Sequence, residues 1–308
     1  MTDIKEVGSL IFFIDDNLYS VPAAGTVYFI AENKKVLIDT GPATSLEAVL
    51  NGIRQTGFKP EEIDYIIITH IHLDHSGGVG TMLQHMPRAK VIAHHKAIKH
   101  LIDPSRLVNS AIEAQGREFV SGNGEVLPVP EPRLIPVNDG ETLDLGNGQV
   151  LTFMSCPGHA PHELCIIESR NRGIFVGDAV GHYINGTDMM VPVTPPPSFD
   201  LEQYIATLER LKGLDADKIY FAHSGTSPQV QEKLDLAVRK LRDRDNIIAQ
   251  AAAENNLEQA AERVIKHVSN ELVWLREHLR PVYDYWTGVD IPMSAAEHVR
   301  YYKKKHGL

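Results

Sequence analysis

HIHLDH at residues 70–75 places three imidazoles and a carboxylate within six residues. The stretch follows the apolar run 65–69, which is typical of a buried β-strand. Residues two apart in an extended segment face the same way, so His70 and His72 can bind one metal ion, whereas Asp74 and His75 can face a second ion. Imidazole nitrogen and carboxylate oxygen suit zinc, and they also suit iron or manganese. A polar loop with several surface histidines is the alternative interpretation.

Three later segments repeat the order of a short apolar strand, a possible ligand and small residues. His159 ends CPGH after the apolar run 150–155, Asp178 ends IFVGD, and His223 ends IYFAH and precedes Ser-Gly. A lone His or Asp after a strand is usually a capped turn or a solvated end, so each segment alone is a weak signal. Together they supply the ligands that two ions need beyond the four at residues 70–75.

With LIDTG at residues 37–41, these segments make the chain resemble the metallo-β-lactamase-fold superfamily from about residue 25 to residue 225. The resemblance implies an α/β fold, a four-layer αββα sandwich with the site at one edge between two sheets. It also implies two divalent metal ions per chain, zinc first, with iron or manganese as alternatives. The seven ligands that it implies are His70, His72 and His159 for the first ion, Asp74, His75 and His223 for the second, and Asp178 as the bridge.

The bridging carboxylate bears on the reaction. Zinc β-lactamases of this fold typically lack an aspartate at the position of Asp178, so the resemblance favours the hydroxyacylglutathione hydrolase, lactonase and thioesterase branches. Asp74 and Asp178 only partly neutralise two divalent ions, and the remaining positive charge should make a bridging water acidic. The expected enzyme is a dinuclear metallohydrolase whose hydroxide attacks a thioester or related acyl substrate. Asp74 or an imidazole then passes a proton to the leaving group.

Three alternatives remain open at this point. The first is a lactonase. The second is an iron-dependent sulfur oxygenase, similar to persulfide dioxygenases, which use one iron held by two His and one Asp; the full set of seven ligands argues against it. The third is a regulatory or binding protein of low turnover that keeps the fold.

Other polar residues near these motifs have weaker assignments. Asp39 is expected to orient a ligand imidazole, against the simpler role of a strand-end cap. His182 and Tyr183 lie just beyond Asp178 and are candidates to face the substrate, against a partly exposed loop. His162 is expected to be an exposed polar residue.

The periodicity predicts strands at 9–14, 26–31, 35–39 and 90–94 and helices at 45–55, 76–86 and 200–212, the last capped by Asp200. Residues 133–168 are expected to form a meander of strands. The segment 104–132 is expected to be an irregular loop because of its glycines and prolines. PVTPPP at 192–197 is expected to border the mouth of the active site, because it fits neither a helix nor a central strand.

The chain is expected to divide near Ser227 into a catalytic domain, 1–226, and a helical C-terminal extension, 227–308. Helix breaks are expected near residues 255–256, Ser269 and Pro281. The aromatic residues of the extension are expected to form its own core. As an alternative, residues 281–286 act as a lid over the metal site.

Composition limits the cellular setting and the partners. The chain has 308 residues and a formal charge of −10, which disfavours nucleic acid as a partner. No apolar run approaches a membrane span, and the N-terminus lacks the pattern of a signal peptide, so a cytoplasmic location is expected. Cys156 and Cys165 are expected to be reduced and not to bind metal. The expected partner is a small-molecule acyl substrate, and a homodimer is possible.

Overall fold

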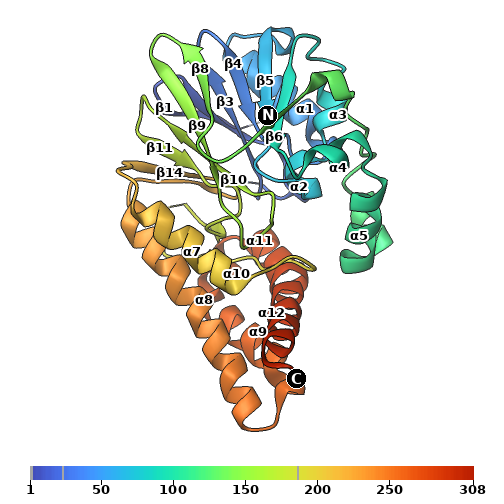
Figure 1. Ribbon diagram of the computed structural model, residues 1–308, viewed down its shortest axis with the longest axis vertical. Helices are drawn as coiled ribbons and strands as arrows, with labels where there is room; N and C mark the ends of the chain where they lie inside the picture. The colour runs from blue at the N-terminus through green and yellow to red at the C-terminus, as the bar shows by residue number, and fades with distance from the viewer. Residues whose placement is uncertain (1–2, 23, 186) are drawn as a thin grey trace.

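Two β-sheets packed face to face, each covered by helices on its outer side, form the centre of the molecule (Figure 1). The computed structural model describes residues 3–22, 24–185 and 187–308. The four-layer αββα arrangement and the helical C-terminal region expected from the sequence are confirmed. The C-terminal helices extend below the sandwich in this view.

The first sheet has the strand order β1-β2-β3-β4-β5-β6-β7. Its first four strands pair antiparallel, and β4 to β7 pair parallel. Parallel strands end at one edge of the sheet, so whatever follows β5 lies beside the ends of β4 and β6. The strands are β1 (Ile4–Gly8), β2 (Ile11–Asp15), β3 (Thr26–Ala31), β4 (Lys35–Ile38), β5 (Ile63–Ile67), β6 (Lys90–His94) and β7 (Leu134–Val137).

The second sheet has the order β15-β14-β11-β10-β9-β8, and a separate pair joins β12 to β13. Its neighbours are antiparallel except for β11 and β14, which are parallel and therefore end at the same edge. The strands are β8 (Thr142–Gly146), β9 (Gln149–Ser155), β10 (Leu164–Glu168), β11 (Gly173–Phe175), β12 (His182–Tyr183), β13 (Met190–Val191), β14 (Lys218–Phe221) and β15 (Gly225–Ser227).

Strand β3 shows how the layers are held together. Successive side chains of a strand point to opposite faces, and both faces of β3 are covered. Val27 and Phe29 pack against the outer helices, whereas Tyr28 and Ile30 pack between the two sheets. Full burial of one such side chain contributes about 1.5–3 kcal/mol, so the sandwich is a stable support for groups at its edge.

Helices α1, α3 and α4 line the outer side of the first sheet, and α7 and α8 line that of the second. In α1, residues Val49, Leu50 and Ile53 form the buried face, as the periodicity predicts. The N-cap Asp200 accepts a hydrogen bond from the backbone N–H of Gln203 at 3.0 Å, as expected. The bounds are α1 (Leu46–Gln55), α2 (Leu73–Ser76), α3 (Val79–Met82), α4 (Ile98–Ile102), α5 (Ser105–Gln115), α6 (Arg117–Ser121) and α7 (Leu201–Lys212).

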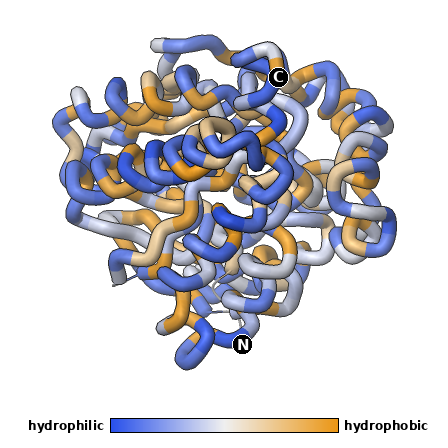
Figure 2. The backbone as a smooth tube through the Cα atoms, turned by 90° about the horizontal axis from the view of Figure 1, so that it is seen from below, coloured by the Kyte–Doolittle hydropathy of each residue, from blue (hydrophilic) through white to orange (hydrophobic). Residues whose placement is uncertain are grey.

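The C-terminal helices have a core of their own, which includes Trp286 and Leu275. Figure 2 shows hydrophilic and hydrophobic residues alternating along their turns, as in helices with one buried face. Two hydrogen bonds between Thr194 and Ser294 tie the proline-rich loop to the extension. Among the described residues no helix combines the length and apolar character of a membrane span. The helices are α8 (Val230–Ala253), α9 (Ala260–Glu271), α10 (Val273–His278), α11 (Arg280–Tyr285), the π-helix η6 (Trp286–Asp290) and α12 (Ile291–His306).

Several element predictions were wrong. Residues 104–132 are not an irregular loop, because α5 and α6 lie within them: the glycines and prolines flank residues 105–115, whose own periodicity is helical. The helix expected at 76–86 is reduced to the single turn of α3, because α2 ends at Ser76 and turns follow at residues 77–78 and 83–85. Strand β7 is not part of a meander but pairs parallel with β6 in the first sheet. The break expected near Ser269 lies at Leu272.

Short turns complete the chain: the 3-10 helices η1 (Leu18–Ser20), η2 (Ala43–Ser45), η3 (Pro60–Glu62), η4 (Glu131–Arg133) and η5 (Leu257–Gln259). The last strand ends at Ser227 and α8 begins at Val230, and the domain division near Ser227 stays a prediction.

The turn after β9 depends on Gly158. Its φ is +135°, a conformation that L side chains rarely adopt, and a Cβ there would lie 2.2 Å from Cα of Tyr204 in α7. The backbone carbonyl of Gly158 also accepts a hydrogen bond from the N–H of Asp200 at 3.0 Å. Glycine is therefore required for α7 to pack against the turn that carries His159.

We expect Gly158→Ala to lower the free energy of unfolding by about 3 kcal/mol or more, because it adds a backbone clash to an unfavourable φ. Gly140→Ala is the matched control, since φ is +82° there but a Cβ meets nothing within 4 Å. The control should cost only about 1 kcal/mol. Urea unfolding followed by tryptophan fluorescence measures both, and equal losses would contradict the role of the α7 contact.

Candidate metal centre

The ends of β5, β9, β11 and β14 bring the seven predicted ligands to one edge of the sandwich. His70 and His72 follow β5, and Asp74 and His75 lie in α2. The remaining three follow the other strands: His159 after β9, Asp178 after β11 and His223 after β14. All seven predicted residues therefore converge, although they are spread over half of the sequence; that they bind metal stays a prediction.

The first group consists of His70, His72 and His159. Nε2 of His70 lies 2.9 Å from Nδ1 of His72, which lies 3.0 Å from Nε2 of His159. Nδ1 of His159 donates to the backbone carbonyl of Val193 at 3.0 Å, which leaves its Nε2 lone pair directed at the other two rings. Burial lowers the pKa of His159 to about 3, so this imidazole is neutral and available as a ligand.

The second group consists of Asp74, His75 and His223. The Nε2 atoms of His75 and His223 are 3.3 Å apart, and Oδ2 of Asp74 lies 3.7 Å from each. Both rings use the other nitrogen to reach a protein acceptor: Nδ1 of His75 lies 3.0 Å from Oδ2 of Asp39, and Nδ1 of His223 lies 2.6 Å from the carbonyl of Ala24. The Nε2 atoms are thereby turned toward one shared point.

Asp178 lies between the two groups. Its Oδ1 is 3.6 Å from Nε2 of His75 and 3.4 Å from Nε2 of His223, whereas its Oδ2 is 3.6 Å from Nε2 of His159. Burial raises the pKa of Asp178, but the neighbouring His75 and His223 outweigh it and hold the pKa well below the usual range. Asp178 is therefore an ionised carboxylate with one oxygen directed at each group.

These donors fit divalent cations. Ring nitrogens of these imidazoles approach one another to 2.9–3.3 Å, a spacing at which either one nitrogen carries a hydrogen or a cation takes the space between two lone pairs. The buried Oδ1 of Asp178 has no hydrogen-bond partner within the described part of the chain. Neutral nitrogen ligands, carboxylate oxygens and a protein acceptor on each second nitrogen are what zinc or iron sites require.

Asp39 contacts the ring of His75, one of the seven predicted ligands, as expected from the sequence. Besides its contact with His75, its carboxylate accepts hydrogen bonds from the backbone N–H and the hydroxyl of Thr69, at 2.8 Å each. Asp39 itself has a φ of +61°, the left-handed conformation that non-glycine residues rarely adopt.

Two residues that hold Asp178 were missed in the sequence. Oε1 of Glu163 accepts a hydrogen bond from the backbone N–H of Asp178 at 2.9 Å and lies 3.5 Å from Nδ1 of His70. The hydroxyl of Tyr204 donates to the carbonyl of Asp178 at 2.7 Å. The sequence offered one signal for Glu163, because it lies directly before the apolar strand β10. A carboxylate in such a position is buried, and buried carboxylates are normally paired with another polar group.

His182, a candidate to face the substrate against a partly exposed loop position, is buried and lines the cavity at the site. Its Nε2 lies 3.6 Å from Oδ2 of Asp178, and its Nδ1 lies 3.3 Å from Oδ2 of Asp290, which the sequence analysis did not identify. Burial lowers the pKa of His182, but contacts with Asp178 and Asp290 outweigh burial and raise it to about 10. Tyr183 faces away from the cavity and packs against Phe221 instead.

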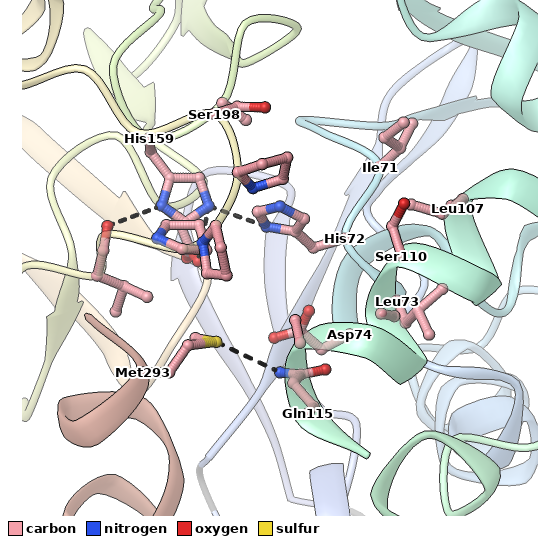
Figure 3. A pocket seen from close by; sticks show the side chains of 18 of the residues that line it. Ile71, His72, Leu73, Asp74, Leu107, Ser110, Gln115, His159, Ser198 and Met293 are labelled. Carbon is pink, nitrogen blue, oxygen red and sulfur yellow. Dashed lines mark hydrogen bonds and ion pairs between the residues drawn. The ribbon is translucent and has the colours of Figure 1, made fainter. Parts of the chain in front are cut away.

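A cavity of about 310 Å³ opens directly onto the ligands (Figure 3). Figure 3 shows His72, Asp74 and His159 on its inner side and Leu107 and Met293 on opposite walls. His162 lines this cavity and is only partly exposed, so the expectation of a simple exposed residue was wrong.

The proline-rich loop borders this cavity through Pro195 to Ser198, as predicted. The C-terminal extension contributes Tyr285, Asp290 and Met293, so it covers the site in addition to having its own core. Most of this cover lies C-terminal to residues 281–286, which were the alternative prediction for a lid. Within that segment, the side chain of Trp286 is buried in the core of the extension and does not line the cavity.

Comparisons with known proteins place this site in a family. A family model described as the metallo-beta-lactamase superfamily matches residues 21–223. The metallo-beta-lactamase fold-containing protein ST1585 of Sulfurisphaera tokodaii is 32% identical over 228 residues, which cover 70% of this chain and 82% of that protein. The solved structure of ST1585 from Sulfolobus tokodaii has a TM-score of 0.63 at 27% identity and covers 82% of this chain and 98% of that chain.

More distant similarities concern parts of larger proteins or the fold alone. The flavo-diiron protein FprA2 of Clostridium acetobutylicum is 28% identical over 71% of this chain, and the match spans 52% of that protein. A B3 metallo-beta-lactamase with an active-site glutamic acid has a TM-score of 0.57 at 19% identity, over 78% of this chain and 89% of that one. Because the family model matches well over half of the sequence, the chain belongs to the metallo-beta-lactamase superfamily.

Proposed function

We propose that this protein is a dinuclear metal-dependent hydrolase that acts on a thioester or a related small acyl substrate. Members of the superfamily are generally metal-dependent hydrolases. The observation that carries the dinuclear proposal is Asp178, whose two carboxylate oxygens face two separate groups of imidazoles. An oxygenase with a single iron needs only one such group.

In this proposal, His70, His72 and His159 hold the first ion, Asp74, His75 and His223 hold the second, and Asp178 bridges them. Ions held there would supply hydroxide near neutral pH and polarise the acyl carbonyl. The chain positions the other groups: Glu163 and Tyr204 fix the backbone of Asp178, and Asp39 fixes the ring of His75.

Asp74 is the carboxylate suited to handle the leaving-group proton. It lines the cavity, and its side chain is 18% exposed, whereas that of Asp178 is 4% exposed. A proton acceptor must reach both the ligand site and the substrate, and Asp74 meets both conditions.

We further propose that residues 1–226 form the catalytic domain and that 227–308 form its helical cover, supported by the cavity contacts of Asp290 and Met293. A cytoplasmic location is supported by Cys156 and Cys165, which are buried free thiols. The proposed partner is a small molecule, because several of the predicted ligands line a cavity of about 310 Å³.

Iron is the alternative metal with specific support, since a relative is named a flavo-diiron protein. That name belongs to a protein of which this chain spans about half. Zinc remains the proposed metal because hydrolysis needs no redox change, and iron binding with oxygen consumption would favour the oxygenase alternative.

We predict that the purified protein contains about two divalent ions per chain and that His223→Ala retains about one, because the group that includes His223 loses a nitrogen ligand. Elemental analysis by mass spectrometry after extensive dialysis measures this. His95→Ala, at an exposed histidine outside the cavity, should retain both ions. A single iron per wild-type chain would refute the dinuclear assignment.

We predict that the metal-loaded protein hydrolyses a generic acyl-thioester faster than an acyl-lactone and that a chelator reduces this activity by at least about a hundredfold. Adding zinc back should restore it. Release of free thiol, measured by a colorimetric thiol reagent, follows the reaction. Greater activity on the lactone would favour the lactonase alternative, and no activity on esters, thioesters, lactones or phosphodiesters would favour a binding protein.

We predict that Asp74→Asn lowers kcat by at least about a hundredfold through loss of both a ligand oxygen and a proton acceptor. Asp284→Asn, at an exposed aspartate of α11, is the control and should leave kcat unchanged. Steady-state kinetics with the same thioester compares the two variants. Normal turnover in Asp74→Asn would exclude this residue from the reaction.

A further inference from the structure

The cavity over the candidate metal centre is asymmetric in charge. The acids that line it are Asp74, Asp178 and Asp290, and each lies within 3.7 Å of an imidazole. A different part of the wall, from α4 and the start of α5, contributes Lys99, His100 and Arg106. We call these three residues the basic rim.

Among the described residues, no acid forms an ion pair with Lys99 or Arg106 of the basic rim. Within residues 3–22, 24–185 and 187–308, the side chains of Lys99 and Arg106 form neither an ion pair nor a hydrogen bond, although the chain carries a net charge of −10. The nearest acid in the sequence, Asp103, accepts a hydrogen bond from the backbone of Ser105 and does not line the cavity. Burial lowers the pKa of His100, and Lys99 and Arg106 lower it further, so positive charge is concentrated at this point.

Part of the cavity wall, contributed by α5, is apolar. Leu107, Ala111 and Ala114 form one face of α5 and line the cavity, although no residue of α5 is buried. Figure 1 shows α5 standing apart from the sandwich. Across the cavity, Met293 of α12 approaches α5, where its Sδ accepts a hydrogen bond from Nε2 of Gln115 at 4.0 Å. An apolar helix face left open on a cavity favours an apolar ligand segment.

We propose that the substrate is an amphipathic acyl thioester whose anionic oxyacid group, a carboxylate or phosphate remote from the reacting carbonyl, is bound by Lys99 and Arg106. This inference rests on the proposed hydrolase function. The apolar middle of the substrate lies along Leu107 and Ala111, and its carbonyl lies at the candidate metal centre. Water adds its oxygen to the carbonyl carbon, the carbon–sulfur bond breaks, and the sulfur leaves as a thiol that carries one of the two protons; the remote anion does not react.

Binding of product analogues tests the anion site separately from catalysis. Suberate and octanoate have chains of equal length, but only suberate carries a second carboxylate. In the metal-loaded protein, Lys99→Gln/Arg106→Gln should weaken suberate binding by about tenfold or more and octanoate binding by less than about twofold. Titration calorimetry measures both, and added salt should weaken suberate more than octanoate.

Lys96→Gln/Arg117→Gln is the matched control, because it removes the same charges from exposed positions that do not line this cavity. It should leave both affinities unchanged. All four substituted side chains are exposed, so both variants should fold. Equal effects of the two double variants, or equal effects of the rim variant on both acids, would overturn the proposal.

Two thioesters locate the anion within the substrate. One is the mono-thioester of suberate with N-acetylcysteamine, which carries the charge on the acyl chain; the other is octanoyl-N-acetylcysteine, which carries it on the thiol. The Lys99→Gln/Arg106→Gln variant should lower kcat/KM about tenfold for one of the two charged thioesters, relative to its effect on the neutral octanoyl-N-acetylcysteamine. The thioester that is affected shows whether the bound anion belongs to the acyl chain or to the thiol. If no thioester is hydrolysed but the suberate effect persists, the anion site stands and the hydrolase proposal fails.

Discussion

The burial of Asp178 among imidazoles is the constraint on which the arrangement of the site depends. An isolated carboxylate in such a dry position costs several kcal/mol, and it can stay ionised only where positive charge or hydrogen-bond donors surround it. Four imidazole Nε2 atoms, those of His75, His159, His182 and His223, lie within 3.6 Å of its oxygens. Its backbone is held from both sides, by Glu163 and by Tyr204. A carboxylate so placed favours cations between itself and the rings.

The same constraint explains why the imidazoles are anchored by distant parts of the chain. His159 donates to Val193 in the proline-rich loop, and His223 donates to Ala24 near the first sheet. Each anchor fixes which nitrogen carries the hydrogen and which one faces the centre. The two sheets supply the strand ends, but loops from both halves of the sandwich determine the ring orientations. The site therefore forms only when the sheets pack against each other.

The sequence predicted that these seven side chains converge, because each follows an apolar strand and strand ends meet at sheet edges whatever the details of packing. The sequence also predicted the contact of Asp39 with an imidazole, because this acid ends a strand and the histidine cluster follows the neighbouring strand of the same sheet. Glu163 and Asp290 were missed because their partners are distant in sequence and no local pattern marks them. Strand β7 was assigned to the wrong sheet, because periodicity identifies a strand but does not choose its neighbour. Helix α5 was not predicted, because the flanking glycines and prolines indicated a loop. The spacing of Leu107, Ala111 and Ala114 is nevertheless that of one helical face.

Part of the cavity wall lies outside the segment that the family model matches. The family model ends at residue 223, whereas Tyr285, Asp290 and Met293 come from the C-terminal helices. Asp290 reaches His182 beside Asp178, so the extension contacts the centre directly instead of only shielding it. It is carried by the π-helix η6, and such irregular turns frequently occur at functional sites. A ligand set shared across a superfamily can thus serve different substrates, because the walls above it are built from other segments.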